Sequence, residues 1–273
     1  MFNLTNVFFR SSSSFRPQPQ LTKQLIFFTL TLISISGWQY TRANAQQQPP
    51  AQLQNLIAQI DNAANKGDVK GVIQHYSPNF THTDGLNRQQ MEQALTSLWK
   101  RYPRLRYNTT IQSWKSEGNT ITAETITKIS GLPSSNRNNF ALNSTIRSRQ
   151  RIVGTKIESQ EVLSERTLIT AGAKPPQVEV KAPEKVKVGQ QFSFDAIVQE
   201  PMGDDYLLGT ALNEPIQPER FLNPTSVELQ LLNAGGLFKI GRAPNNPGSH
   251  WLSAVIMRGE GTTMVTQRIQ VVK

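Results

Sequence analysis

The 273-residue chain contains no cysteine and only three histidines. The lack of cysteine excludes disulfides, thiolate metal sites, a cysteine nucleophile and a bacterial lipoprotein anchor. A metal site needs three or four convergent ligands, and the spacing of the histidines supplies at most two. No glycine-rich phosphate loop is present either. We therefore expect the protein to hold no metal and no cofactor.

Acidic residues are absent from the first 45 residues. Residues 1–24 carry three basic side chains, residues 25–38 are uncharged and mostly apolar, and Ala43-Asn44-Ala45 follows. This pattern is typical of a signal peptide, since only small side chains fit the peptidase before the cut. We predict a signal peptide over residues 1–45 with cleavage after Ala45, followed by a short leader at 46–50. The apolar run is too short to span a bilayer as a helix, so membrane contact is expected only during export.

The charge of the chain changes with this cleavage. The whole chain has 29 basic and 19 acidic residues, and removal of residues 1–45 leaves 25 and 19. No Arg-Arg pair precedes the apolar run, which favours the general secretory route. We expect a periplasmic or secreted protein of a Gram-negative-type bacterium. Nucleic acid is then not an expected partner.

Two halves follow the leader. The sequence of residues 171–176, AGAKPP, interrupts every periodic pattern with small residues and prolines, so we predict a linker there. The linker separates a domain at 51–170 from a domain at 177–273.

The first half begins with helical periodicity and ends with strand periodicity. Apolar residues at helical spacing predict three helices, the first stopped by Gly67, the second capped by Asp68 and the third opened by an Asn87/Gln90 capping box. Four runs rich in threonine, isoleucine and aromatics predict strands at 105–114, 120–129, 140–153 and 156–170. Helices followed by an antiparallel meander predict an α+β layer.

The second half contains strand-like runs alone. They lie at 177–181, 190–199, 206–212, 225–232, 237–242, 251–258 and 262–272, with glycine and proline turns between them. This pattern predicts an all-β sandwich.

The first half resembles the nuclear transport factor 2-like, or SnoaL-like, superfamily. The resemblance rests on the run NLIAQIDNAANKGDVKGVIQHYSPNFTHTDG, the helix after Asn87 and the run KRYPRLRYNTTIQSWKSEGNTITAETITKISG. It implies a cone, in which a curved antiparallel sheet and helices enclose a pocket. Residues 175–273 resemble an immunoglobulin-like domain without its cysteine pair. The expected fold is therefore an α+β cone followed by an immunoglobulin-like sandwich.

Register in the last hairpin of the first half decides which side chains face the pocket. If Gly154-Thr155 is a two-residue loop, with glycine at positive φ, opposing residues are fixed. The predicted pairs are Ile152 with Ile157, Ile146 with Leu163, and Phe140 with Ile169. These apolar pairs share one face, which we expect to be the helix-covered one.

Three arginines alternate on the other face of this hairpin. The same register places Glu158 across from Arg151 and Gln160 across from Arg149. Arg147, Arg149 and Arg151 are either an anion-binding stripe or a solvated strand face with a surface ion pair. We favour the solvated face.

Polar residues are expected on the inner face. The predicted register sends two carboxylates inward, Glu161 and Glu165, and a buried carboxylate without a cation can exchange protons near neutral pH. In enzymes of the resembled superfamily an acidic residue on this part of the sheet often faces the pocket, and Glu165 lies at a comparable place. The alternative is that both carboxylates lie hydrated at the rim. The other polar residues expected inside are Ser144, Ser148 and Gln150.

Further candidates lie near the first strand and on the helices. Tyr76, His82 and Asp84 are candidate acid/base residues, while His75 is expected to be a packing residue. Tyr76, Trp99 and Trp114 are candidate pocket walls, with core packing favoured for Trp99. Isomerases of the resembled superfamily use a tyrosine with two aspartates, its dehydratases a Tyr/His/Asp set and its epoxide hydrolases an Asp-Arg-Asp set. This sequence reproduces none of these sets at recognisable spacing.

Three functions remain open. We favour binding, either of a small apolar or amphipathic molecule in the cone, or of an envelope protein through the cone rim or the sandwich. The alternative is a cofactor-free isomerase, dehydratase or hydrolase that uses Glu165 or Asp84 as base. The third is a structural adaptor whose cone is filled by its own side chains. A homodimer through the cone sheet is compatible with all three.

Overall fold

The computed structural model describes residues 48–131, 140–201, 203, 205–223, 225–259 and 261–273. The predicted signal peptide, the start of the leader and most of the predicted loop at 131–139 lie outside the described residues. Within the described ranges, none of the helices has the length and apolar character needed to cross a bilayer.

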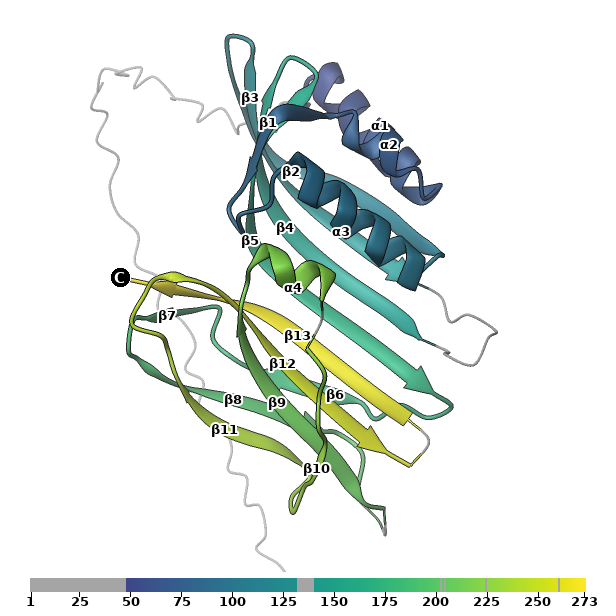
Figure 1. Cartoon of the computed structure of the whole chain (residues 1–273), viewed down its shortest axis with the longest axis vertical. Helices are drawn as coiled ribbons and strands as arrows, with labels where there is room; N and C mark the ends of the chain where they lie inside the picture. Colours follow the sequence, from purple (N-terminus) through teal and green to yellow (C-terminus); the bar gives the residue numbers. More distant parts are fainter. Residues whose placement is uncertain (1–47, 132–139, 202, 204, 224, 260) are drawn as a thin grey trace, which may run out of the picture. The chain divides into compact units, whose positions relative to one another are not determined.

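The structure is mostly antiparallel sheet with few helices (Figure 1). Strands from both halves of the chain form one ten-stranded sheet. Its main order is β10-β9-β12-β13-β5-β4-β3-β2, and in addition β1 pairs with β5 and β7 pairs with β13. A second sheet has the order β11-β8-β6.

Helices in the first half are α1 (Ala51–Asn65), α2 (Val69–Ile73) and α3 (Arg88–Arg101). Gly67 follows α1 with a φ of 68°. The Asp68 carboxylate accepts a hydrogen bond from the backbone N–H of Gly71 at 2.9 Å and so caps α2. Asn87 and Gln90 form the reciprocal capping box at the start of α3.

The strands of the first half lie beneath these helices. The helices cover one face of the sheet (Figure 1), and their apolar sides share a buried cluster with the inward side chains of the strands. The strands are β1 (Tyr76–His82), β2 (Leu105–Glu117), β3 (Thr120–Gly131), β4 (Ala141–Val153) and β5 (Lys156–Gly172).

The second half contains strands on two layers. Buried side chains of β8 pack in one cluster with those of β9, β12 and β13. The expected run at 225–232 is a strand at only two residues, and two elements were not expected, β7 and the short helix α4. The elements are β6 (Val178–Lys181), β7 (Lys185–Lys187), β8 (Gln191–Val198), β9 (Leu207–Pro215), α4 (Pro218–Leu222), β10 (Gln230–Leu231), β11 (Gly236–Arg242), β12 (Gly248–Arg258) and β13 (Gly261–Val272).

The two halves have separate cores but share a sheet. Two clusters of buried hydrophobic residues are present, one in each half. The residues predicted to begin the linker, Ala171 and Gly172, belong to β5 and pair with Thr262 and Gly261 of β13. Strand β5 therefore lies between β4 and β13, and backbone hydrogen bonds join the halves along it.

The loop of the β4–β5 hairpin is the predicted one. Gly154 has a φ of 57°, Val153 pairs with Lys156, and Ile152 pairs with Ile157. Beyond these pairs the register shifts twice, since β5 contains an extra residue at Glu158 and another at Leu163.

These two bulges correct four of the predicted pairs. Ile146 faces Glu165 and not Leu163, and Ile169 faces Leu142 and not Phe140. Arg149 faces Glu161 and not Gln160, while Arg151 faces Ser159 and not Glu158. A one-residue shift moves side chains to the other face of a sheet, so only the segment between the two bulges is reversed. Gln160 and Val162 therefore face the cavity, Glu161 faces solvent, and Glu165 faces inward again.

Candidate functional site

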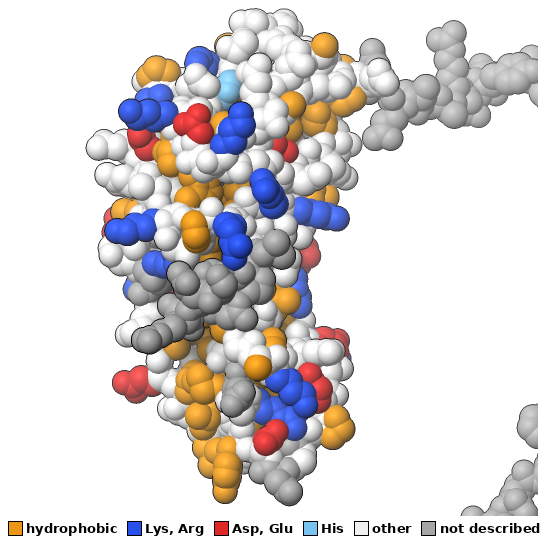
Figure 2. Space-filling view, turned by 90° about the vertical axis from the view of Figure 1, so that its right-hand side faces the viewer, with side chains coloured by type: hydrophobic (Ala, Val, Ile, Leu, Met, Phe, Trp, Pro, Cys, Tyr) orange, Lys and Arg blue, Asp and Glu red, His pale blue; other side chains and the backbone are white. Residues whose placement is uncertain are grey.

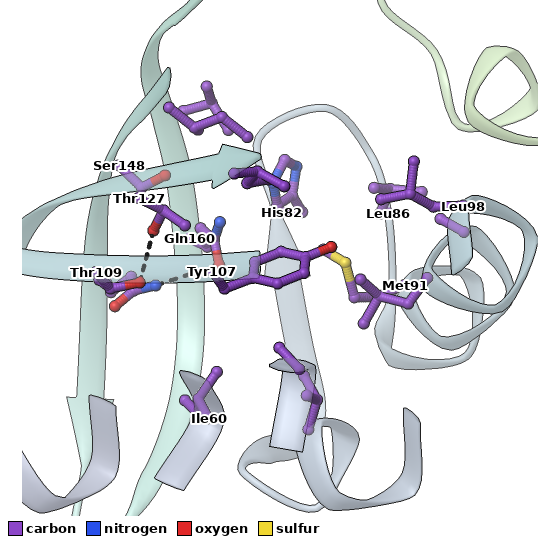
Figure 3. Close-up of a pocket in the computed structure, with 18 of the residues that line it drawn as sticks. Ile60, His82, Leu86, Met91, Leu98, Tyr107, Thr109, Thr127, Ser148 and Gln160 are labelled. Carbon is purple, nitrogen blue, oxygen red and sulfur yellow. Dashed lines mark hydrogen bonds between the residues drawn. The ribbon is translucent and has the colours of Figure 1, made fainter. Parts of the chain in front are cut away.

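A cavity of about 280 Å³ lies between the helices and the inner face of the sheet of the first half. Its walls come from α1, α2, α3 and strands β1 to β5, and two residues of the second half complete it, Phe221 on α4 and Arg268 on β13. Figure 3 shows the Tyr107 ring reaching across this space toward Met91, with His82 nearby. Most of the lining surface is apolar, and polar side chains reach it from α1 and from each of the strands β1 to β5.

The apolar part of the cavity consists of helix side chains and aromatic rings. Trp99 donates a hydrogen bond from Nε1 to the hydroxyl oxygen of Tyr107 at 2.7 Å, and the two rings meet edge to face. Trp99 is thus both a core residue and a wall residue. The aliphatic lining includes Ile57, Ile60, Ala64, Val72, Leu86, Met91, Ala94, Leu95, Leu98, Ile129, Ile146 and Val162.

Two tyrosines of this lining stay neutral. Burial raises the pKa of Tyr76 to about 12, and it raises the pKa of Tyr107 to about 12 against the opposing effect of the Trp99 hydrogen bond. Both hydroxyls are therefore uncharged at neutral pH. Tyr76, the first residue of β1, packs edge to face on Phe80 of the same strand.

A buried ion pair closes one part of the cavity wall. Arg268 donates from Nη1 to Asp84 Oδ1 at 2.9 Å and from Nη2 to Asp84 Oδ2 at 2.7 Å. The two side chains are 1% and 2% exposed. This bidentate geometry is the strongest form of arginine–carboxylate contact. It also joins the turn after β1 to the last strand of the chain.

Glu165 is the second carboxylate on this arginine. Its Oε2 accepts from Trp251 Nε1 at 3.0 Å and from Arg268 Nη2 at 3.3 Å. Trp251 and Arg268, both from the second half, thus hold the carboxylate in place. The Trp251 ring in turn packs edge to face on Phe221. The other oxygen of Glu165, Oε1, has no hydrogen-bond partner among the residues that the structure describes. Glu165 lines the cavity, as the predicted register required.

His82 lies beside this pair with its tautomer fixed. The backbone N–H of Asp84 donates to His82 Nδ1 at 3.1 Å, so Nδ1 accepts and the proton of the neutral ring lies on Nε2. Burial lowers the pKa of His82, Asp84 opposes that shift, and Arg268 adds to it. The ring is therefore neutral at pH 7 and offers a hydrogen-bond donor rather than a base.

Two glutamines extend the polar part of the wall. Gln150 Nε2 lies 3.5 Å from Gln160 Oε1, and both side chains line the cavity. The Oε1 atom of Gln150, whose side chain is buried, has no partner within the described part of the chain, and the same holds for Nε of Arg268. Ser148 also lines the cavity, whereas Ser144 is buried in a hydrogen bond with Thr167.

Asp61 on α1 is a third carboxylate of the lining. Its two oxygens accept from the backbone N–H and the hydroxyl of Thr109, both at 2.7 Å. No cation contacts it among the described residues. The cavity lining thus contains the carboxylates Asp61, Asp84 and Glu165 and one guanidinium, Arg268.

The outer face of β3 to β5 carries the three alternating arginines, each with a carboxylate partner. Arg147 and Arg149 contact Glu124 at 2.6 and 2.8 Å, and Arg149 also contacts Glu161 at 2.9 Å. Arg151 pairs with Glu158. Glu161 was expected to face inward, and the bulge at Glu158, which lies between the loop and Glu161, is the reason that it does not. These pairs fit the solvated-face interpretation. Figure 2 shows another side of the molecule, the one on the right of Figure 1, and there too basic side chains are scattered rather than gathered into one patch.

The remaining predicted residues lie elsewhere. His75 is buried beside a shallow surface pocket that includes Lys156, and Trp114 does not line the cavity. Burial, together with Lys156, lowers the pKa of His75. Within the described ranges, no group of three or more histidine, aspartate or glutamate side chains is arranged to hold a metal ion.

Residues that the sequence did not indicate are Arg268, Trp251, Phe221 and Asp61. The first three come from the second half, which was treated as a separate domain. The apolar alternation of β13 did not indicate Arg268, because it lies on the opposite face of the strand from Val265, Ile269 and Val271.

Comparisons with known proteins give one family match and several similar folds. Residues 173–272 match a family model described as a domain of unknown function, DUF8623. No curated protein matches the chain.

Three solved structures illustrate the similar folds. A scytalone dehydratase-like protein from Novosphingobium aromaticivorans is 8% identical, with a TM-score of 0.35 and coverage of 41% of this chain and 80% of that one. An LEH-like epoxide hydrolase from Mycobacterium tuberculosis is 10% identical, with a TM-score of 0.30 and coverage of 41% and 80%. TsrD from Streptomyces laurentii is 15% identical, with a TM-score of 0.31 and coverage of 42% and 88%. At this level of similarity they assign neither activity nor ligand to this chain.

Proposed function

We propose that this protein binds a small amphipathic molecule in the cavity of its first half. The observation that carries the proposal is the cavity itself, whose mostly apolar walls also contain the polar side chains of His82, Gln150, Gln160 and Glu165, here called the polar cluster. Ligand sites commonly combine a mostly apolar lining with a few fixed polar groups. An adaptor with a filled interior would not need this space.

The polar cluster is held rigidly enough to orient a ligand. Arg268 and Trp251 fix one oxygen of Glu165, and the backbone N–H of Asp84 fixes His82. Such supporting contacts keep polar groups in the geometry that binding requires. The apolar tail of a ligand would then lie against α1 and α3.

A titration tests this proposal. We expect octan-1-ol to bind the purified protein with one site per chain in isothermal titration calorimetry. Leu95→Trp, which fills the cavity from α3, abolishes the binding. Gln93→Trp adds the same ring on an exposed position of the same helix and leaves binding unchanged. Equal binding by the two variants, or none by the wild type, would contradict a cavity site.

A second candidate is a cofactor-free hydrolase in the same cavity. What favours it is the Asp84–Arg268–Glu165 set, an acid–arginine–acid arrangement like that of the epoxide hydrolases of the resembled superfamily. The Oε1 atom of Glu165 would act as general base toward a water molecule. Hydrolysis of 1,2-epoxyoctane that is lost in Glu165→Gln and kept in Glu161→Gln would support this role. Equal rates in both variants would exclude it.

The remaining interpretations belong to the same proposal. The first half is taken as a nuclear transport factor 2-like cone, which the helices over an antiparallel sheet and the enclosed cavity support. The second half is taken as an immunoglobulin-like sandwich, which its two packed layers support. Export with cleavage after Ala45 rests on the sequence pattern alone, as do an envelope partner and a homodimer through the sheet.

A further inference from the structure

The charge of the cavity lining is opposite to that of the protein. The chain has a formal net charge of +10, whereas the described residues of the lining include three carboxylates and one guanidinium. The neutral state of His82 and the two tyrosines adds no positive charge. A cleft lined by one sign of charge concentrates the field in its low-dielectric interior.

Arg268 is not available to an anionic ligand. Both of its terminal nitrogens donate to Asp84, and Nη2 donates to Glu165 as well. A ligand carboxylate that approached Arg268 would also approach these two carboxylates. Like charges at short range repel strongly where water is excluded.

Glu165 supplies the free acceptor of the polar cluster. Its Oε1 has no partner among the described residues, whereas the unpartnered Oε1 of Gln150 and Nε of Arg268 are fully buried and out of reach of a ligand. The free donor of the cluster is Nε2 of His82. A ligand carboxylate brings acceptors only, so beside Glu165 it would leave this oxygen unsatisfied and add a second negative charge, whereas a hydroxyl group both donates and accepts.

Resting on the proposed function, we infer that the cavity selects against anions and takes an amphipathic molecule whose head donates hydrogen bonds, that is, an alcohol or an amine. The head lies at the free Oε1 of Glu165.

Three probes with the same tail separate these possibilities. Octylamine, octan-1-ol and octanoate are titrated into the purified protein at pH 7 by isothermal titration calorimetry. We expect the amine and the alcohol to bind at least about tenfold more tightly than octanoate, a ratio that corresponds to about 1.4 kcal/mol. Octanoate that binds as tightly as octan-1-ol overturns the charge selection and leaves the binding function intact. Absence of binding by all three overturns the proposed function and this inference together.

Variants locate the selection. Glu165→Gln removes one negative charge from the polar cluster. We expect it to bring the affinities for octylamine and octanoate closer together. Asp61→Asn removes a charge from α1 and does the same, which keeps the test valid if Glu165→Gln perturbs Arg268. The matched control is Glu161→Gln on the outer face of the same strand, which leaves all three affinities unchanged. An equal narrowing in the control would show that overall charge, and not the cavity lining, sets the preference.

Discussion

The arginines of this protein occur in two contrasting environments. Those at 147, 149 and 151 lie on the outer face of β4 with side chains about half exposed, at 51%, 47% and 49%. Arg268 lies on β13 with its side chain 1% exposed and bonded to Asp84. The residue types are the same in both places, and the hydrogen-bond lengths are similar.

What differs is the consequence of losing a partner. An ion pair exposed to water contributes little to the free energy of unfolding, because solvent and salt can replace either partner. In the interior, neither water nor salt can replace a lost cation beside a carboxylate. Removing one partner of a buried ion pair is therefore costly even where the pair as a whole contributes little to the free energy of unfolding. The outer arginines therefore affect mainly the charge of the surface, whereas Arg268 determines whether the cavity wall and the junction between the halves can form.

The largest expected effect is that of Arg268→Met. It leaves Asp84 buried without a cation, so we expect the free energy of unfolding to fall by about 3–5 kcal/mol. The matched variant Arg149→Met on the outer face changes it by at most about 1 kcal/mol. Urea unfolding at pH 7 measures both. Similar small changes in the two variants would remove the distinction between the two environments.

The double variant Arg268→Met/Asp84→Asn sharpens the same comparison. Removing the carboxylate charge together with the guanidinium leaves a neutral amide, so the double variant is expected to be more stable than Arg268→Met alone. This result distinguishes the cost of an unpaired charge from the loss of packing. An equal or lower stability of the double variant would mean that packing by the arginine side chain is the main effect.

Trp251→Phe is expected to have the next largest effect. It removes the N–H that donates to Glu165 and keeps an aromatic ring beside Phe221. A hydrogen bond to a charged group contributes about 1.5–3 kcal/mol, and we expect a loss of stability in that range. A double-mutant cycle with Glu165→Gln gives the coupling between the two residues. A coupling energy near zero would show that the hydrogen bond does not stabilise the junction.

The pH dependence of stability follows from the neutral state of His82. Its pKa is lowered in the folded protein by burial, with Asp84 opposing and Arg268 assisting, so below about pH 6.5 the unfolded chain binds more protons than the folded one. The free energy of unfolding therefore falls as the pH decreases from about 6.5, and it is insensitive to this residue above that pH.

The control for this pH effect is a variant that cannot titrate. His82→Asn retains an acceptor for the Asp84 N–H, and we expect it to show a weaker fall in stability at acidic pH. His75 and His250 also have lowered pKa values because of burial, so a residual fall is expected. Identical urea unfolding profiles against pH for the variant and the wild type would contradict the role of His82.

The smallest expected effect is that of Glu124→Gln on the outer face. Hydrogen bonds from Arg149 and Arg147 hold the pKa of Glu124 below its usual value. Loss of this charge should lower stability by at most about 1 kcal/mol, and high salt should abolish the difference. Unfolding at low and high salt, with Arg268→Met measured in parallel, tests this. If Glu124→Gln lowered the free energy of unfolding equally at low and high salt, the Glu124–arginine pairs would behave like the buried Arg268–Asp84 pair.

The sequence predicted much of the local structure because local signals decide it. The stop at Gly67, the cap at Asp68, the capping box at Asn87 and the two-residue bend at Gly154 all depend on residues close in the chain. The bulges at Glu158 and Leu163 were not predicted, because neither carries a glycine or another mark in the sequence. They explain why Glu161 and Glu165, four residues apart, face opposite sides of the sheet.

The site was predicted only in part for a different reason. His82, Asp84 and Glu165 were candidates because of their residue types, but Arg268, the common partner of the two carboxylates, lies far along the chain in the other half. Pairing between β5 and β13 brings it there, and no local pattern indicates such a long-range strand pair. The glycine and proline residues at 171–176 suggested separation of the halves, while the strand before them continues the sheet.

A crystal structure of the protein with octylamine bound tests the account most directly. We expect the ammonium group within hydrogen-bond distance of Glu165, with the octyl chain against α1 and α3 and with the Arg268–Asp84 pair unchanged. The account would be contradicted by an amine bound outside the cavity, or by a ligand that releases Arg268 from Asp84.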